Sequence, residues 1–414
     1  MLDKKVSMTA PSGAGLSADE IRGALGGALA GAKGRVLLVV PDHTRFHSNA
    51  GFIANFIYHE LEPRGRVDLL EALGTHVPMT REQCAAMYGD VPFERFIAHD
   101  WRADTERLGE VPGDFVREAS EGVMDAPIAV EVNRLLTGSG YDLILSVGQV
   151  VPHEVAGMAN HTKNIFVGCG GADMINSSHM LGAFYGMERI MGRDRTPVRM
   201  VFDYAAERFL AHLPLYYVLT VTTAPAGDIV THGLYAGHGR GCFEEAVAEA
   251  QRRNITLLDA PIRKAVVYLD ESEFHSTWLG NKAIYRTRMA MADGGELVVL
   301  APGVRRFGED AAVDALIRKY GYCGRGNVLH LFREHDDLRA NMSAAAHLIH
   351  GSSEGRFSVT YCTRHLSAAE VTAAGFAHMP YDEAAALYQP GGEGYFYIPN
   401  PALGLWADRA RFGG

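Results

Sequence analysis

The sequence has few cysteines and no long apolar run, and these shortages exclude several classes of protein. Five cysteines in 414 residues is an odd count, and no two of them are separated by only two residues. A disulfide framework and a cysteine-based zinc site are therefore not expected, and a reducing cytoplasm fits the count. No run of about 18 apolar residues offers a membrane span. No apolar signal-peptide segment follows Lys4 and Lys5, so we expect a cytoplasmic protein without a membrane partner.

The chain also lacks a basic block and the common phosphate-binding motifs. Its 39 Lys and Arg residues are outnumbered by 49 Asp and Glu residues, which gives a net charge of −10. Such a chain is a poor nucleic-acid binder, and no nucleic-acid partner is expected. No P-loop pattern is present. The glycine-dense segment Gly237–Gly241 fails the dinucleotide fingerprint, because its last glycine follows the second by two residues and the fingerprint requires three.

Glycine and histidine are frequent, and short apolar runs alternate with amphipathic segments. The 46 glycines and 18 histidines stand in a chain with 47 % apolar and 21 % charged residues, which excludes a disordered chain, a coiled coil and a collagen. Capping boxes at Ser17–Glu20 and Thr80–Gln83 predict two helix starts. Further helices are predicted at 47–61, 243–253, 277–291 and 309–320. Strands are predicted at 35–40, 66–73, 96–100, 128–132, 142–147, 164–167, 216–222, 265–269, 296–300, 327–332 and 357–362.

This alternation predicts an α/β fold with mainly parallel sheets and helices on both sheet faces. We expect two α/β domains, a cofactor-binding domain over residues 1–260 and a C-terminal domain over 261–414, with the last residues able to pack back on the first domain. Ligands of open α/β sheets bind beyond the carboxyl ends of the strands. The active site is therefore expected in a cleft between the two domains.

Two polar segments follow the first predicted strands. Asp42, Thr44 and Arg45 come directly after strand 35–40, where an arginine fork suits a phosphate or a carboxylate. The alternative to ligand binding is an ordinary strand-to-helix turn in which Asp42 or Thr44 caps the helix. His76 follows strand 66–73 in the segment Gly74–Thr80, and a histidine there could act as a general acid or base. Its alternative is a surface loop histidine.

A third segment, between residues 148 and 179, is the richest in chemically active side chains. Glycines separate His153, Lys163 and His179, and small loop residues let a bulky ligand approach the backbone. No second histidine lies four residues after His153, so the zinc-protease pattern is absent. Read singly, Lys163 could be a solvated charge and His179 a helix-surface residue.

Taken in order, these segments resemble the nickel-pincer-nucleotide-dependent lactate racemase family. Lys163 follows His153 by ten positions, and His179 follows Lys163 by sixteen. The resemblance is carried by Asp42-x-Thr44-Arg45, Gly74-Thr75-His76, Pro78-Met79-Thr80, Pro152-His153, Ala156-Gly157, Lys163, His179, Lys282-Ala283 and Asp293-Gly294-Gly295.

The resemblance implies a cofactor, pyridinium-3,5-bisthiocarboxylic acid mononucleotide carrying nickel. By this likeness Lys163 forms a covalent thioamide link to the cofactor and His179 is the protein ligand of the nickel, which suits square-planar geometry. His76 and His153 are implied as paired acid/base residues. The substrate carboxylate is assigned to Arg45 and Lys282, and the nucleotide to Asp42, Thr44, Gly74, Thr75, Gly157 and Gly168.

The implied reaction is racemisation or epimerisation of a 2-hydroxy carboxylic acid through a 2-keto acid. Hydride moves reversibly to the cofactor while one histidine takes the hydroxyl proton, and enzymes that build the cofactor are needed for activation. Val77 after His76, Trp278 near Lys282 and the absence of paired glycines before Lys163 depart from the family pattern. We therefore leave the substrate open, and Trp278 points to a larger or aromatic acid.

Two other functions remain as alternatives. A zinc-dependent hydrolase or lyase could use His76, His153 and His179 as ligands, but it would leave Lys163 without a role. An inactive small-molecule-binding homologue would be expected to lose one of the paired histidines, and both are present.

Overall fold

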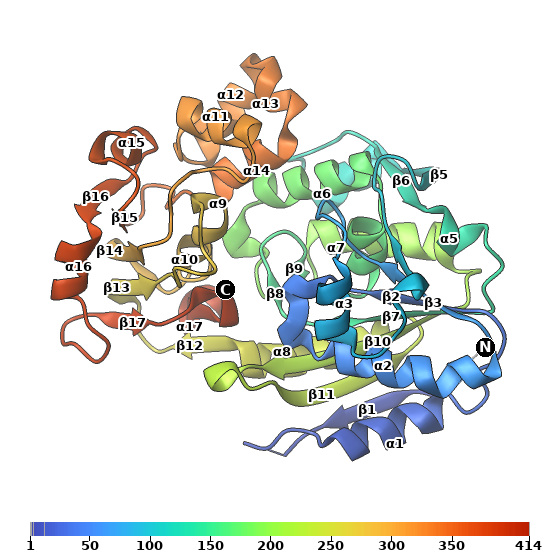
Figure 1. Cartoon of the computed structure of the whole chain (residues 1–414). Coiled ribbons are helices and arrows are strands. Elements are labelled where there is room, and N and C mark those ends of the chain that lie inside the picture. The colour runs from blue at the N-terminus through green and yellow to red at the C-terminus, as the bar shows by residue number, and fades with distance from the viewer. Residues whose placement is uncertain (1, 3, 12, 414) are drawn as a thin grey trace. The chain divides into compact units, whose positions relative to one another are not determined.

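A computed structural model describes residues 2, 4–11 and 13–413 and divides the chain into two compact units (Figure 1). Unit 1 comprises Met1–Ser178 and Met191–Asn254, and unit 2 comprises His179–Ile190 and Ile255–Gly414. The domains predicted from sequence placed residues 179–190 in the first domain. Across the described ranges, no helix is both long and apolar enough to cross a membrane.

Unit 1 contains a seven-stranded sheet whose centre is parallel. Strand order is β1-β11-β10-β7-β2-β3-β4, and only the pairs β1–β11 and β11–β10 are antiparallel. The bounds are β1 Val6–Thr9, β2 Val36–Val40, β3 Val67–Glu71, β4 Phe96–Ala98, β7 Leu143–Gln149, β10 Leu215–Thr223 and β11 Val230–Gly237. Two antiparallel pairs lie outside this sheet: β5 Thr105–Val111 with β6 Ile128–Asn133, and β8 Pro152–His153 with β9 Gly157–Met158.

The core of unit 1 is built on strand β2. All five residues Val36–Val40 are buried, as a strand covered on both faces requires. Helix α2 packs against β2 and β7, and α8 packs against β10 and β11. The helices are α1 Ala18–Ala28, α2 Ala50–Leu61, α3 Arg81–Tyr88, α4 Gly113–Ala119, α5 Arg134–Thr137, α7 Pro197–Ala205 and α8 Arg240–Asn254. Helix α6, Ala172–Tyr185, begins in unit 1 and ends in unit 2.

Unit 2 contains a five-stranded, wholly parallel sheet in the order β16-β15-β14-β13-β17. Its strands are β13 Ile262–Tyr268, β14 Met291–Ala301, β15 Ser358–Thr363, β16 Ala377–Pro380 and β17 Phe396–Ile398, and β12 Ile255–Leu258 pairs separately with β18 Leu405–Asp408. Its helices are α9 Thr277–Gly280, α10 Lys282–Tyr285, α11 Ala311–Tyr320, α12 Arg325–Glu334, α13 Asp336–Ala340, α14 Met342–His350, α15 Ala368–Ala373, α16 Tyr381–Leu387 and α17 Arg409–Gly413. The prediction of an α/β fold with mainly parallel sheets is confirmed.

Three predicted elements are wrong. Residues 164–167 form a π-helical turn, Asn164–Gly168, instead of a strand; the Cys169 N–H bonds to the carbonyls of Asn164 and Ile165. Residues 327–332 belong to helix α12, because Val328, Leu331 and Phe332 are also spaced for one helical face. The predicted helix 277–291 is two short helices, α9 and α10, and Met291 already starts strand β14.

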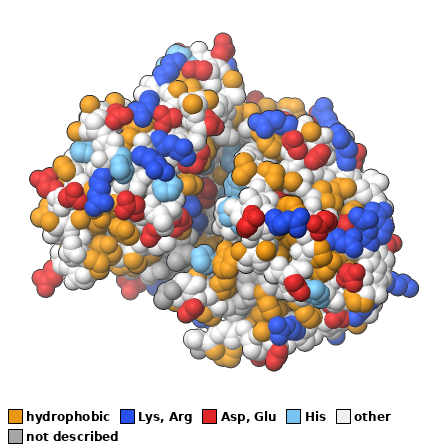
Figure 2. Space-filling view, viewed as in Figure 1, with side chains coloured by type: hydrophobic (Ala, Val, Ile, Leu, Met, Phe, Trp, Pro, Cys, Tyr) orange, Lys and Arg blue, Asp and Glu red, His pale blue; other side chains and the backbone are white. Residues whose placement is uncertain are grey.

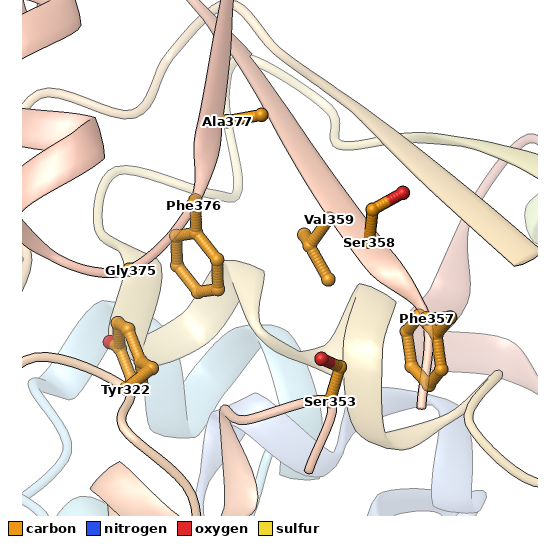
Figure 3. A pocket seen from close by; sticks show the side chains of 8 residues that line it. All are labelled: Tyr322, Ser353, Phe357, Ser358, Val359, Gly375, Phe376 and Ala377. Carbon is orange, nitrogen blue, oxygen red and sulfur yellow. The ribbon is translucent and has the colours of Figure 1, made fainter. Parts of the chain in front are cut away.

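Unit 2 holds a small cavity of about 170 Å³, and no residue proposed for the site from sequence lines it. Three aromatic rings and two serine hydroxyls surround it beside strands β15 and β16 (Figure 3). Its lining residues are Tyr322, Ser353, Phe357, Ser358, Val359, Gly375, Phe376 and Ala377. On the face shown in Figure 2, basic and acidic side chains are interspersed within each unit.

All five cysteines are free thiols, and four of them are buried. Burial raises the pKa of the thiols of Cys84 and Cys242 to about 11 and that of Cys362 to about 12. The pKa values of Cys169 and Cys323 are raised by burial as well. At neutral pH these side chains are thiols and not thiolates.

Candidate functional site

The ends of strands β2 and β3 bring Asp42 and His76 together. Nδ1 of His76 donates to Oδ2 of Asp42 over 2.6 Å, with Asp42 almost fully buried and His76 about half exposed. The second carboxylate oxygen, Oδ1, accepts from the backbone N–H of Thr44 at 2.8 Å and from the Thr44 hydroxyl. Asp42 is thus both the cap of the following helical turn and the hydrogen-bond partner of His76.

Electrostatics favour the ionised form of Asp42. Burial alone would raise the pKa of its carboxyl group. The hydrogen bond and charge of His76, the Thr44 hydroxyl and the charge of Arg45 outweigh burial and hold that pKa well below its usual range. Asp42 is therefore a carboxylate at neutral pH, which fixes the proton of a neutral His76 ring on Nδ1 and leaves Nε2 as the acceptor.

Arg45 lies on the exposed turn after strand β2. Its Nη1 donates to the Thr44 hydroxyl at 3.3 Å. Among the residues that the structure describes, its guanidinium forms no ion pair with another side chain, and the remaining N–H groups can therefore bind an anion.

The glycines predicted to face a nucleotide are also required by the local backbone conformation and packing. Gly74 has a positive φ of 56°, and its N–H donates to the carbonyl of Gly168 at 2.8 Å. A Cβ at Gly168 would lie 2.9 Å from Cβ of Ala72. Gly157 has a φ of 83° and pairs with His153 across β8 and β9. Thr75 is exposed in the loop that carries His76.

His153 is held in the opposite tautomer to His76. Nδ1 of His153 accepts the backbone N–H of Val155 at 3.1 Å and that of Ala156 at 3.4 Å. A ring nitrogen that accepts carries no proton, so a neutral His153 has its proton on Nε2. Unit 1 therefore contains one histidine that presents an acceptor nitrogen and one whose Nε2 carries a proton.

Lys163 is partly buried at the start of the π-helical turn Asn164–Gly168. Burial, together with the positive charges of Arg45 and Arg199, lowers the pKa of its amine to about 8, against the opposing charges of Glu154 and Asp42. A substantial fraction of this amine is therefore neutral near pH 8, and a neutral amine is nucleophilic.

The remaining predicted residues belong to unit 2 and are described within it. His179 is half-buried on helix α6, in the segment His179–Ile190. Lys282 opens helix α10, with its ammonium 5.6 Å from the ring centre of Phe274. Trp278 on α9 stacks on His347, with ring centres 4.1 Å apart.

The part of the chain that the structure describes contains no group of three or more His, Cys, Asp or Glu side chains able to hold a metal ion.

Two buried side chains near these loops were missed from sequence. His99 donates from Nε2 to the carbonyl of Gly170 at 3.0 Å and accepts at Nδ1 from Asn133 at 2.9 Å, and burial lowers its pKa. Arg199 on helix α7 is fully buried and binds the segment before Lys163. No sequence pattern identifies either residue, because both donate hydrogen bonds to backbone carbonyls that are distant in the chain.

Comparison with known proteins agrees with the resemblance seen in the sequence. Residues 24–189 match the family model described as lactate racemase N-terminal domain. A lactate racemase from Thermoanaerobacterium thermosaccharolyticum is 25 % identical over 289 residues, which cover 66 % of this chain and 61 % of that protein. The predicted resemblance to lactate racemases is confirmed.

Two solved structures share the fold. A crystal structure of a protein from Thermotoga maritima aligns with a TM-score of 0.82 and 24 % identity over 96 % of this chain and 99 % of that one. The lactate racemase apoprotein from Thermoanaerobacterium thermosaccharolyticum aligns with a TM-score of 0.71 and 17 % identity over 98 % and 95 %.

Proposed function

We propose that the protein is a racemase or epimerase of a 2-hydroxy carboxylic acid that works with a nickel-pincer nucleotide. The observation that carries the proposal is the pair of complementary histidines, in which His76 presents an unprotonated Nε2 and His153 a protonated one. Inverting a carbinol centre through a 2-keto acid requires one group that takes the hydroxyl proton and another that returns a proton. The similarity to lactate racemases supports the same reaction class.

The residues of unit 1 fit the proposed cofactor by their chemistry. The Lys163 amine, with a pKa of about 8, is suited to condense with a thiocarboxylic acid and release water. Arg45 provides open N–H groups for a phosphate or carboxylate. In this proposal Lys163 holds the cofactor, His179 binds the nickel, and Arg45 with Lys282 holds the substrate carboxylate.

When bound, the nucleotide supplies an electrophilic carbon that can accept a hydride from the substrate. His76 then takes the hydroxyl proton at Nε2, and the ionised Asp42 stabilises the resulting imidazolium through Nδ1. His153 delivers its Nε2 proton in the opposite half of the reaction. The reverse direction exchanges these roles, and carboxylate binding by Arg45 keeps the keto acid oriented between the two steps.

The decisive experiment produces the protein together with the cofactor-building enzymes. Bound nickel, a nucleotide-sized mass increase that is lost in Lys163→Ala, and interconversion of enantiomers in a panel of 2-hydroxy acids by chiral chromatography are expected. His76→Ala and His153→Ala should each keep the mass increase and lose racemisation. A wild-type protein without nickel and without the adduct under these conditions would refute the proposal.

A further inference from the structure

The three residues before Lys163 include a backbone conformation that side chains disfavour. Asn160 and His161 are consecutive and both left-handed, with φ values of 66° and 56°. In this region the Cβ atom crowds the following carbonyl, so the conformation persists only where the surroundings hold it. Glycine adopts this conformation without that crowding, and the family pattern has paired glycines before the lysine where this chain has none.

Arg199 binds this turn from helix α7. Its Nη2 donates to the carbonyl of Met158 at 2.6 Å, and its Nη1 donates to the carbonyl of Asn160 at 3.3 Å and to the Thr162 hydroxyl at 2.8 Å. The guanidinium also lies 4.4 Å from the ring centre of Phe243. Burial lowers the pKa of Arg199 to about 10, so it stays charged at neutral pH.

The side chains of the turn are fixed as well. The His161 ring lies 3.9 Å from the ring of Tyr217 and 4.9 Å from that of Phe243, centre to centre. Nε2 of His161 donates to the carbonyl of Gly239 at 2.9 Å, and burial lowers its pKa to about 3, so the ring is neutral. Oδ1 of Asn160 accepts the N–H of His161 at 2.7 Å.

The turn leads directly into the helical start at Lys163. The Asn164 N–H donates to the carbonyl of His161 at 2.9 Å, which closes the turn around Lys163. The Thr162 hydroxyl, which accepts from Arg199, donates to Asp203 at 3.3 Å. The three residues before Lys163 are thus each tied to the body of unit 1, and Arg199 contacts two of them.

We propose that Arg199 is a positioning residue for Lys163: its planar fork holds the left-handed Asn160–His161 turn closed and so fixes the backbone that presents the lysine amine to the cofactor. The proposal rests on the proposed function in so far as Lys163 is the attachment residue. Met158 and Asn160 offer backbone carbonyls as acceptors, and Thr162 offers its hydroxyl. One guanidinium satisfies all three, whereas an ammonium on a flexible stem is a point charge without the fixed fork.

The substitution Arg199→Lys separates geometry from charge. The charged groups that act on Lys163 are Arg45, Glu154, Arg199 and Asp42, and this variant leaves the sign of all four unchanged. Any change that Arg199→Lys causes in the reactivity of Lys163 therefore comes from loss of the planar guanidinium and its fixed hydrogen-bond geometry. Thr162→Val is a second variant that removes one acceptor of Arg199 with little change of shape, and it serves if Arg199→Lys folds poorly.

The first measurement uses the cofactor-free protein. Acetylation of Lys163 by acetic anhydride is followed against pH by peptide mass spectrometry, with the exposed Lys33 as internal reference. In the wild type we expect a midpoint near pH 8. In Arg199→Lys the loosened turn should expose the amine and move the midpoint toward the ordinary lysine range. An unchanged midpoint and rate in both variants would overturn the proposal.

The second measurement uses protein made together with the cofactor-building enzymes. Arg199→Lys should carry the nucleotide-sized adduct in a fraction lower by about tenfold, the size expected when a buried charged hydrogen-bond network is broken. Adding Asn160→Gly, which makes the left-handed conformation easy, should restore part of the adduct. Wild-type loading in Arg199→Lys would overturn the proposal. Absence of the adduct from the wild type would instead count against the proposed function, and the acetylation profile would still decide the role of Arg199.

Discussion

His76 Nδ1 and Asp42 Oδ2 lie 2.6 Å apart although 34 positions separate the two residues in the chain. Strands β2 and β3 pair in parallel, so their carboxyl ends meet at one edge of the sheet. The residues that follow each strand are thereby brought together. A carboxylate behind a histidine fixes its tautomer and stabilises its protonated form, as general acid/base chemistry requires.

Replacing Asp42 by Asn should therefore impair catalysis much more than binding. The amide cannot stabilise an imidazolium as a carboxylate does, and we expect kcat to fall by about 10²–10⁴-fold, the range of general acid/base contributions. The KM should change little, because His76 does not hold the substrate carboxylate in the proposal. Enantiomer interconversion followed by chiral chromatography measures both constants. Asp90→Asn is a matched control, since Asp90 bonds to His59 at 2.9 Å on the exposed surface. Equal losses in the two variants would contradict the assignment.

Lys163→Met should stabilise the cofactor-free protein in a pH-dependent way. The folded-state pKa of about 8 lies below the ordinary lysine value of about 10.5. Burial in the folded protein therefore disfavours the charged amine and lowers the free energy of unfolding. This destabilisation is complete below pH 8 and disappears as the pH rises toward 10.5, the ordinary pKa of lysine. Urea unfolding of wild type and variant should show the largest difference at pH 7 and a smaller one at pH 10. The substitution Lys33→Met, at an exposed lysine, serves as the control. A difference that grows with pH would contradict the lowered pKa.

His179→Ala should separate metal binding from cofactor attachment. If His179 is the protein ligand of nickel and Lys163 the attachment residue, the variant keeps the nucleotide-sized adduct and loses nickel. Intact mass and metal analysis of the same sample measure the two independently. Loss of the adduct with retention of nickel would be incompatible with both assignments. His330, an exposed helix histidine that pairs with Glu334, is a suitable site for the control His330→Ala.

Trp278→Ala should change which 2-hydroxy acid is preferred. Trp278 precedes Lys282, the proposed ligand of the substrate carboxylate, by four positions, and its indole stacks on the His347 ring. Loss of the indole should lower kcat/KM for acids with large or aromatic side chains by about tenfold, in keeping with loss of one aromatic contact, and should affect lactate less. Competition between phenyllactate and lactate gives the ratio directly. An unchanged ratio would exclude Trp278 from the substrate pocket.

Local sequence patterns were enough to predict the fold class and several helix starts and strands. The capping boxes at Ser17 and Thr80 form as expected, because both partners of each box lie within one helical turn. Strand β2 was evident from an uninterrupted apolar run. The run at residues 164–167 was misjudged for the same reason: a short buried apolar segment has no period that separates a strand from a helix.

The sequence predicted which residues belong to the candidate site. It did not predict which groups their side chains would hydrogen-bond. Asp42 was expected to hold the cofactor, and its carboxylate is bonded to His76 and Thr44. Arg199 escaped notice because the sequence analysis predicted no element over helix α7, and no sequence pattern identifies a buried charge. Contacts with distant backbone carbonyls depend on tertiary packing, which no local window contains.

The burial of the thiols has a practical consequence. Four of the five cysteines are enclosed, and their raised pKa values keep them poor nucleophiles at neutral pH. An alkylating reagent should therefore leave them unmodified in the native protein and react with them once the surrounding core opens. Because Cys84 and Cys242 lie in unit 1 and Cys362 lies in unit 2, the order of their modification during heating would report which unit loosens first. The chain thus carries its own set of unfolding reporters, distributed over both units.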